Sequence, residues 1–445
     1  MKQVRTTALD IRQFIDDQPF SSFQLRTSVI CGILVFMDGF DAQAMGYVAP
    51  ALTAQFAITR AALGPVLSSG LVGMMIGALI CGPLADRFGR KPVLVTCGLI
   101  FGLGALVTAT ATSVQSLIMF RLLTGLGLGG AMPNAIALTS EYAPKRIRAT
   151  TVMTMFCGFS IGAAVGGFVA AGLITRFGWQ SVFVVGGVLP ILIAVVSIAA
   201  LPESIRFLVL KGQNREKAVA YLSRIAPGSG PFGELSAGAD EHQSGSFVVK
   251  ELFNEGRSVV TMLIWVMFFM NLLNLYFLNS WLPTVMSDNG IAVQTAILVT
   301  TLFQIGGAVG TLLLGRVVDR FLTFKVLAWT YLLAGACIFL IGESGATVAL
   351  LILSVFASGF FVVGGQTASN ALTAEFYPTA MRSTGVGWAL GVGRVGSIIG
   401  PTLGGVLLSM AAQTRQVFWA AAIPPLIAMA AAFSAAYVLG KGRSK

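Results

Sequence analysis

Four formally charged side chains stand inside otherwise apolar stretches of the sequence: Asp38, Asp41, Arg121 and Arg394. A charged side chain costs at least about 2.5–3.5 kcal/mol at the centre of a bilayer, so each is expected to face a cavity or an opposite charge. Both aspartates lie in FMDGFDAQAMG, residues 36–46, spaced to share one face of a helix. A carboxyl group in a low-dielectric site can hold a proton near neutral pH, whereas an adjacent arginine favours its charged form. These residue types can therefore exchange protons and, through a guanidinium, bind a carboxylate with two parallel hydrogen bonds.

The chain around these residues has the composition of a membrane protein. Of its 445 residues, 56% are hydrophobic and only 11% are charged, whereas soluble domains carry about 25% charged residues. Apolar stretches near the roughly 20 residues that cross a bilayer recur along the whole length. We therefore expect an all-α membrane protein with twelve transmembrane helices. The expected spans cover residues 24–50, 62–83, 92–112, 115–140, 149–174, 180–201, 259–283, 295–315, 324–342, 346–371, 384–411 and 416–440.

Other motifs give no support for an enzyme or a metalloprotein. The five cysteines fall in apolar segments without metal-ligand spacing, and no Gly-x₄-Gly-Lys-Ser/Thr loop for ATP is present. GLGLGG at 125–130 contains Gly-x-Gly-x-x-Gly, but it lies within a span, where small residues allow close helix packing. The spans hold no constellation of His, Cys and carboxylate residues. We expect no metal, no cofactor and no enzyme activity.

The distribution of positive charge predicts the orientation in the membrane. The first 22 residues lack the pattern of a secretory signal, so the first apolar segment is expected to be retained as a span. With the N-terminus in the cytoplasm, the cytoplasmic segments hold 24 of the 29 Lys and Arg residues. This asymmetry predicts that both termini are cytoplasmic. It also accounts for the net charge of +11 without a nucleic-acid partner.

One long polar stretch divides the chain into two groups of six spans. We expect a cytoplasmic N-tail (1–22), a six-helix bundle (23–202), a cytoplasmic central loop (203–258), a second six-helix bundle (259–440) and a cytoplasmic C-tail (441–445). In the central loop, KGQNREKAVAYLSRI predicts a short helix on the membrane surface, and a segment rich in Gly, Ser and Pro predicts a linker. The single histidine, His242, lies in that linker, so it is not expected to relay protons.

Three pairs of segments repeat at nearly one offset. EYAPKRIRAT at 141–150 aligns with EFYPTAMRST at 375–384, GPLADRFGRK at 82–91 with GRVVDRFLTF at 315–324, and GFSIGAAVGG at 158–167 with GSIIGPTLGG at 396–405. Offsets of 234, 233 and 238 residues indicate two homologous halves in the same orientation. Parallel repeats with a site between them near the midplane are typical of alternating-access transporters.

These segments also resemble signatures of the major facilitator superfamily (MFS). GPLADRFGRK resembles the loop between its second and third helices, RLLTGLGLGG its fourth helix, and LPESIRFL at 201–208 the segment that closes its sixth helix. DGFDAQAMGYVAPAL at 38–52 and GVGRVGSIIGP at 391–401 resemble the first and eleventh helices of its aromatic acid:proton symporter branch. The resemblance covers essentially the whole chain. It implies the MFS fold and import of an aromatic carboxylate, of the benzoate or 4-hydroxybenzoate type, together with protons across a bacterial inner membrane.

The loop segments predict a charge latch between neighbouring helix ends, formed in the outward-facing state and broken on the way inward. The alternative is that these charges only set the topology. The candidate latch residues are Gly82, Asp86, Arg87, Gly89, Arg90, Glu141, Arg148, Asp319, Arg320, Glu375 and Arg382.

The four charges within the spans form the predicted transport site. At about 1.5 Å rise per residue, Asp41 and Arg121 lie at similar depths, so we expect them to pair and Asp41 to take the proton, with Asp38 assisting. A purely structural ion pair is the alternative. Arg394 is the preferred anchor for the substrate carboxylate, with Asp41 nearby. Side chains that could complete the site through hydrogen bonds or ring stacking are Tyr47, Asn134, Asn271, Asn274, Tyr276, Gln304, Phe361, Gln366, Asn370 and Trp388.

Two other functions are compatible with the same fold. One is a symporter for another organic anion, such as a dicarboxylate or an aliphatic acid. The other is a chemosensor for aromatic acids. In each case we expect a functional monomer in the lipid bilayer.

Overall fold

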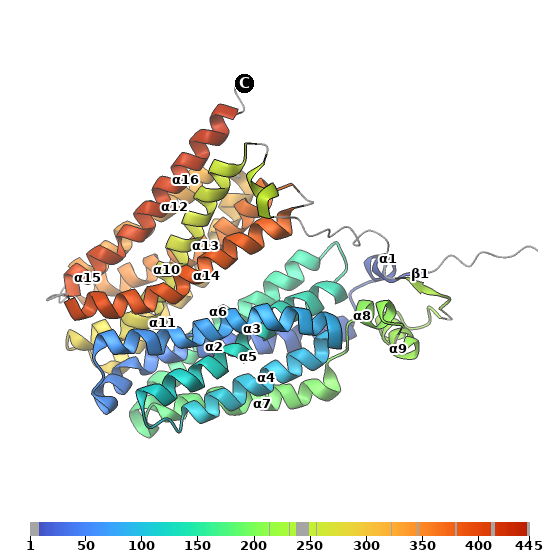
Figure 1. Cartoon of the computed structure of the whole chain (residues 1–445), viewed down its shortest axis with the longest axis horizontal. Helices are drawn as coiled ribbons and strands as arrows, with labels where there is room; N and C mark the ends of the chain where they lie inside the picture. Colours follow the sequence, from blue (N-terminus) through green and yellow to red (C-terminus); the bar gives the residue numbers. More distant parts are fainter. Residues whose placement is uncertain are drawn as a thin grey trace, which may run out of the picture.

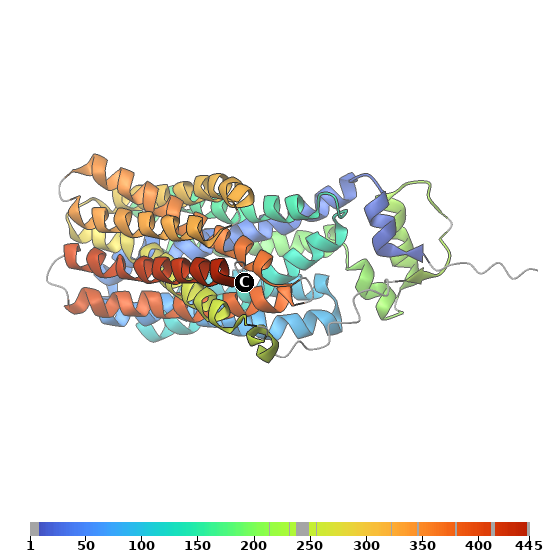
Figure 2. The same cartoon turned by 90° about the horizontal axis from the view of Figure 1, so that it is seen from above.

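The computed structural model of the chain is built almost entirely from long helices that run alongside one another (Figures 1 and 2). It describes residues 9–212, 214–230, 232–236, 249–254, 256–321, 323–344, 347–378, 381–410 and 414–442. Twelve segments in these residues are long and apolar enough to span a membrane, which confirms the predicted number. The first half contributes α2 (Ser22–Phe56), α3 (Arg60–Phe88), α4 (Arg90–Thr108), α5 (Val114–Tyr142), α6 (Arg148–Phe177) and α7 (Gln180–Ala200). The second half contributes α10 (Ser258–Asp288), α11 (Val293–Phe321), α12 (Phe324–Glu343), α13 (Val348–Phe376), α14 (Arg382–Met410), α15 (Thr414–Ala421) and α16 (Ile423–Gly442).

Local sequence explains where several helices begin and end. Ser21 and Ser113 each form a capping box at the start of α2 and α5, which satisfies backbone N–H groups that have no partner within the helix. Between α3 and α4, Gly89 has φ +101°, a conformation that glycine adopts without a steric penalty. The chain can therefore turn from one span into the next with a single residue.

The predicted twelfth span, residues 416–440, is present and is divided into α15 and α16. Pro424 and Pro425 explain the break, because proline has no backbone N–H to donate to the carbonyl four residues earlier. Pro425 thus leaves the carbonyl of Ala421 without its helical partner. The side-chain amide of Asn274, on α10, donates to that carbonyl at 2.7 Å.

Close contacts between helices depend on glycine. In the segment GLGLGG, Gly125 and Gly129 lie against the backbone of α3 at Gly70 and Met74, while Gly127 lies against the backbone of α4. A Cβ atom at any of these glycines would clash with main-chain atoms that cannot rotate away. The glycines therefore serve helix packing, which in a bilayer relies on van der Waals contact between close backbones.

The two halves touch along three helix pairs: α2 with α10, α3 with α14 and α6 with α11. Arg60 and Asp288 form an ion pair of 2.6 Å between the start of α3 and the end of α10. The Ser68 hydroxyl donates to the carbonyl of Ile398 at 2.7 Å, again between the halves. These contacts lie at one end of the molecule, and Figure 1 shows the two halves diverging toward the other end, where α8 (Ile205–Leu210) and α9 (Arg215–Ile225) lie.

The diverging end of the first half carries a small cap. Strand β1 (Leu9–Asp10) pairs in parallel with β2 (Leu235–Ser236), and α1 (Ile11–Asp17) follows directly after β1. Ile11 and Ile15 of α1 are buried in one hydrophobic cluster with residues of α8 and α9. Helix α9 confirms that the predicted segment is helical, and it packs against α1 and α8, whereas the ordered N-terminal segment was not predicted. A short 3₁₀ helix, η1 (Val249–Phe253), precedes α10, and His242 lies outside the described residues.

We predict that Gly129→Ala lowers the stability of the first half, because the new methyl group would meet the backbone of Met74. Overpacking of this kind costs about 1–3 kcal/mol. Thermal unfolding of the purified protein in detergent measures the effect. Gly172→Ala on α6 is the matched control, because nothing lies within 4 Å of its added Cβ. Equal melting temperatures for the two variants would contradict the packing role of Gly129.

Candidate functional site

Asp41 and Arg121 form a buried, bidentate ion pair between α2 and α5. The two guanidinium nitrogens Nη1 and Nη2 donate to Oδ1 and Oδ2 of Asp41 at 2.8 and 2.7 Å. Both side chains are almost completely buried. The guanidinium also lies 5.6 Å from the centre of the Phe183 ring on α7. The pair anticipated from similar depths is thus present, and it ties three helices of the first half together.

Asp38 lies one helical turn before Asp41, and its surroundings are quite different. Its side chain is only 2% exposed, yet neither carboxylate oxygen has a hydrogen-bond partner in the described residues. The charged groups that act on it are Arg394 of the second half and Asp41. The two aspartates that look equivalent in the sequence therefore differ: one is fully paired, and the other has no direct partner.

Arg394 is a positive charge of the second half and lies on α14. Its Nη1 donates to the hydroxyl of Tyr276, on α10, at 3.3 Å, and the side chain is half-buried. In the described part of the chain, no carboxylate lies within ion-pair distance of its guanidinium. Arg394 can therefore donate to an added anion without first breaking an ion pair.

The predicted amides form short hydrogen-bonded chains in the second half. Asn271 donates to Gln366 at 2.8 Å, and Gln366 donates to Asn370 at 3.4 Å, which links α10 to α13. Gln304, on α11, donates at 2.9 Å to Asn279, a residue that the sequence analysis did not single out. Two further amides have partners that suggest structural roles. Asn274 closes the break after α15, and Asn134 donates to a carbonyl of its own helix.

Three of the predicted aromatic residues occupy different environments. Tyr47 is fully buried where the halves meet, and its hydroxyl donates to the carbonyl of Ala163 at 3.3 Å. Phe361 is half-buried and packs edge-on against Phe360 at 5.0 Å. Trp388 is 45% exposed and stacks on Trp265, with ring centres 5.9 Å apart. Of the aromatic candidates, Tyr276 is therefore the one that contacts Arg394.

Comparisons with known proteins identify the family of the chain. Residues 27–302 match the family described as Sugar (and other) transporter, and residues 264–444 match Major Facilitator Superfamily. The chain belongs to the major facilitator superfamily. The 4-hydroxybenzoate transporter PcaK of Pseudomonas aeruginosa is 45% identical over 95% of both chains. The gallate transporter of Pseudomonas putida is 40% identical, with 94% of this chain and 93% of the relative covered.

More distant proteins show the same family and fold. The benzoate transport protein of Acinetobacter baylyi is 33% identical over 96% of this chain and 92% of its own length. A solved bacterial homologue of the human lysosomal transporter Spinster has a TM-score of 0.75 at 16% identity, covering 94% of this chain and 98% of that one. The MFS architecture of twelve helices in two halves is thus confirmed, and the relatives are transporters rather than enzymes.

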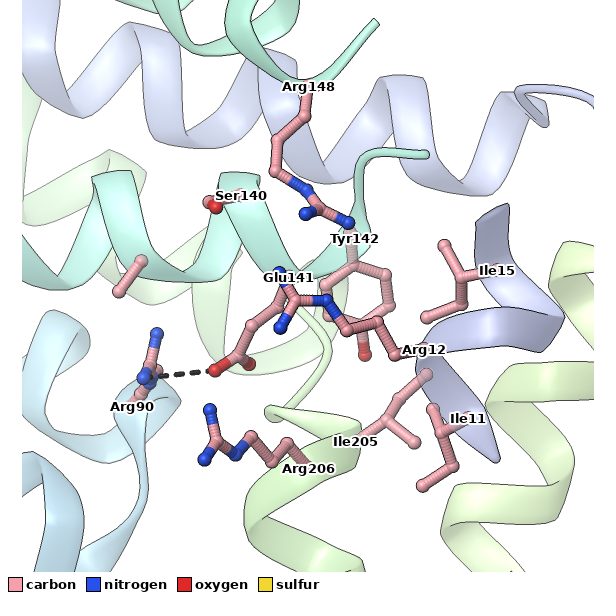
Figure 3. Close-up of a pocket in the computed structure, with 11 residues that line it drawn as sticks. Ile11, Arg12, Ile15, Arg90, Ser140, Glu141, Tyr142, Arg148, Ile205 and Arg206 are labelled. Carbon is pink, nitrogen blue, oxygen red and sulfur yellow. Dashed lines mark ion pairs between the residues drawn. The ribbon is translucent and has the colours of Figure 1, made fainter. Parts of the chain in front are cut away.

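The MFS loop segment takes part in a network of charges at the diverging end of the first half. Arg90 pairs with Glu141 at 2.9 Å (Figure 3). Glu203, which the sequence analysis did not single out, accepts from the backbone N–H groups of Arg90 and Lys91 at 2.8 and 3.2 Å. The Pro-Glu-Ser sequence around Glu203 was the feature of the sequence that could have pointed to this residue. The network joins the start of α4 and the C-terminal end of α5 to the segment before α8.

Other candidate latch residues differ in their surroundings. Arg148 pairs at 3.1 Å with Asp16 of α1. The polar composition of the N-terminal residues did not predict this ion pair. Asp86 and Arg87 are exposed, and the Arg87 guanidinium lies 5.2 Å from the centre of the Phe88 ring. Glu375 is exposed, and a Cβ added at Gly82 would meet nothing within 4 Å. The side chains of Asp319, Arg320 and Arg382 lie outside the described residues.

The two aspartates should respond differently to neutralisation. Asp41→Asn leaves Arg121 as a buried charge without its counter-ion, and breaking a buried pair in this way costs about 3–5 kcal/mol. Asp38→Asn removes a carboxylate that makes no hydrogen bond, so its cost should stay below about 1 kcal/mol. Denaturant titration of both variants in the same detergent measures the difference. A similar loss of stability in both variants would contradict the assigned surroundings.

Proposed function

We propose that this MFS member is a symporter that imports 4-hydroxybenzoate, or a closely related aromatic monocarboxylate, together with protons. The relatives that cover nearly its whole length are named for such acids. The observation that carries the mechanism is the Asp38 carboxyl group, which is buried and has no hydrogen-bond partner in the described residues.

Arg394 is the proposed anchor for the substrate carboxylate. Its planar guanidinium can form two parallel hydrogen bonds with a carboxylate, and the Tyr276 hydroxyl accepts a hydrogen bond from it, which orients the group. The amide chain of Asn271, Gln366 and Asn370 on neighbouring helices offers donors and acceptors for a ring hydroxyl. An acid with one carboxylate and one hydroxyl suits this combination.

A dicarboxylate is less suited to the same site. A second carboxylate would require a second cation, since burying an unpaired charge is costly. Well inside the described spans, the other arginine is Arg121, and both of its terminal nitrogens already donate to Asp41. These contacts favour a monocarboxylate over the rival dicarboxylate function.

Asp38 is the proposed proton carrier in the conformation described here. A buried carboxylate that makes no hydrogen bond is unstable as an anion, whereas Asp41 is stabilised as an anion by two hydrogen bonds from Arg121. Asp41 was the proton carrier predicted from the sequence, because its depth in the membrane matches that of Arg121. Depth shows which groups can be neighbours, but it does not show which carboxylate accepts hydrogen bonds. In this scheme Asp41 keeps the negative charge that holds Arg121 in place.

Competition for Arg394 couples the proton to the substrate. When Asp38 is protonated, Arg394 has no opposing charge nearby and is available to the substrate carboxylate. When proton and substrate have both left, the ionised Asp38 can interact with Arg394 again. The pH difference drives the cycle: one proton that enters with one carboxylate anion moves no net charge, so each pH unit supplies about 1.4 kcal/mol.

The proposed orientation places the diverging end, with α8 and α9, in the cytoplasm of a bacterial inner membrane. Polar segments at this end carry most of the Lys and Arg residues, as the positive-inside rule requires. The halves are joined at the opposite end by Arg60–Asp288 and Ser68. The conformation is therefore inward-facing, and transport requires these outer contacts to separate while the cytoplasmic ends close.

Uptake into proteoliposomes tests the function. Labelled 4-hydroxybenzoate should accumulate at least about 10-fold when an inward proton gradient is imposed, since one pH unit stores about 1.4 kcal/mol. An uncoupler should abolish the accumulation. Succinate accumulation that benzoate does not inhibit would overturn the aromatic assignment. Binding of the acid without any uptake would instead support the chemosensor.

Asp38→Asn tests the coupling scheme. The amide imitates the protonated carboxyl group, so the variant should bind the acid and exchange labelled for unlabelled substrate across the membrane. It should not accumulate substrate against a gradient, because no proton can be released. Exchange and accumulation are measured in the same proteoliposomes. Gradient-driven accumulation at the unmodified protein's level would rule Asp38 out as the proton carrier.

A further inference from the structure

Two arginines meet over one aromatic ring where the first span begins. The guanidinium carbons of Arg26, on α2, and Arg224, on α9, lie 5.6 and 5.8 Å from the centre of the Phe23 ring. Arg26 follows Phe23 by about one helical turn, so its side chain reaches back toward the start of the span, as arginines near the ends of membrane helices do. The ring is largely buried. It therefore gathers positive charges from two separate elements at a fixed point.

Neither guanidinium has a negative partner within ion-pair distance in the described part of the chain. The ion pairs there join other side chains. Both arginine side chains are exposed. A contact with an aromatic ring positions a guanidinium but does not neutralise its charge. The two arginines therefore favour an anion at the surface beside Phe23.

An apolar stripe runs along α2 from the same point. Leu25, Val29 and Ile33 follow one another at four-residue spacing, so they share one face of the helix. Their side chains are 53%, 49% and 42% exposed, which leaves a continuous surface for another molecule to cover. The core residues Ile30 and Leu34 lie on a different face of α2. In a bilayer the stripe therefore contacts lipid chains.

We propose that this part of α2, together with Arg224, binds an anionic phospholipid. Its phosphate lies between the guanidinium groups of Arg26 and Arg224, and one acyl chain follows Leu25, Val29 and Ile33. A phospholipid supplies both an anion and a long apolar chain, whereas inorganic phosphate leaves the stripe uncovered. The direction also agrees, because α2 runs from Arg26 into the bilayer.

The lipid joins two parts of the molecule. Helix α9 packs against α1 and α8, so a phosphate shared by Arg26 and Arg224 ties this group of short helices to the first span. A zwitterionic headgroup carries its own ammonium, which competes with the arginines for the phosphate, so an anionic headgroup is preferred. In the proposed orientation the lipid belongs to the cytoplasmic leaflet. The site itself does not depend on which substrate is transported.

Native mass spectrometry of the full-length protein in detergent tests the proposal. Phosphatidylglycerol is added, and phosphatidylcholine with the same acyl chains is the zwitterionic comparison. We expect one phosphatidylglycerol site that binds at least about 10-fold more tightly than phosphatidylcholine. Arg26→Gln combined with Arg224→Gln should weaken it at least about 10-fold, since each basic side chain near anionic lipid contributes about fivefold in affinity. Arg26→Lys combined with Arg224→Lys keeps both charges and should retain most of the binding.

Lys211→Gln combined with Lys217→Gln is the matched control, because it removes the same charge from exposed positions outside the site. It should bind phosphatidylglycerol like the unmodified protein. Equal losses in the control and in the arginine variant would show attraction to general positive charge and would overturn the site. Unchanged binding in the arginine variant does the same, as does displacement of the lipid by inorganic phosphate. If the arginine double variant fails to fold, full affinity in both single variants overturns the proposal, and a loss in each supports it.

Discussion

The buried pair between Asp41 and Arg121 is the interaction on which the rest of the site depends. It occupies both terminal nitrogens of Arg121, so the first half has no second cation at this depth for Asp38. The positive charge that acts on Asp38 comes instead from Arg394 in the other half. Because the Asp41–Arg121 pair is closed to Asp38, the protonation of Asp38 in the first half depends on Arg394 in the second half. Proton coupling requires this kind of dependence between the halves, because the halves are the parts that move.

Close backbone packing allows these charges to lie so deep. Gly70 of α3 lies beside the Arg121 guanidinium, and a Cβ there would approach it to 3.3 Å. Gly39, between the two aspartates, lies directly against the backbone of α6 at Phe159. The α2 helix is therefore held by main-chain contact on one side and by an ion pair on another.

Much of this arrangement could be predicted from the sequence, and the failures share a cause. Hydropathy predicts the number of spans because each helix must satisfy its own backbone in lipid. Helical rise places Asp41 level with Arg121. Neither quantity gives the rotation of a helix about its axis, so neither predicts that Trp388 stacks on Trp265. Likewise, α1 and β1 are ordered by distant partners at Ile205 and Leu235, which no local pattern reveals. The break at Ala422 was foreseeable, because Pro424 and Pro425 are visible in the sequence.

The proposed transport cycle requires two opposed states, and the ion pairs differ between the two ends of the molecule. At the end opposite α8 and α9, the halves are tied to each other by Arg60–Asp288. At the diverging end, the charges of the loop segment are satisfied within the first half, through Arg90–Glu141 and Glu203. These internal partners stabilise the end of the bundle when the other half has moved away, so opening does not leave buried charges unpaired. Closing that end requires the second half to compete for the same groups. In the proposed cycle the contact between the halves is therefore made at one end at a time.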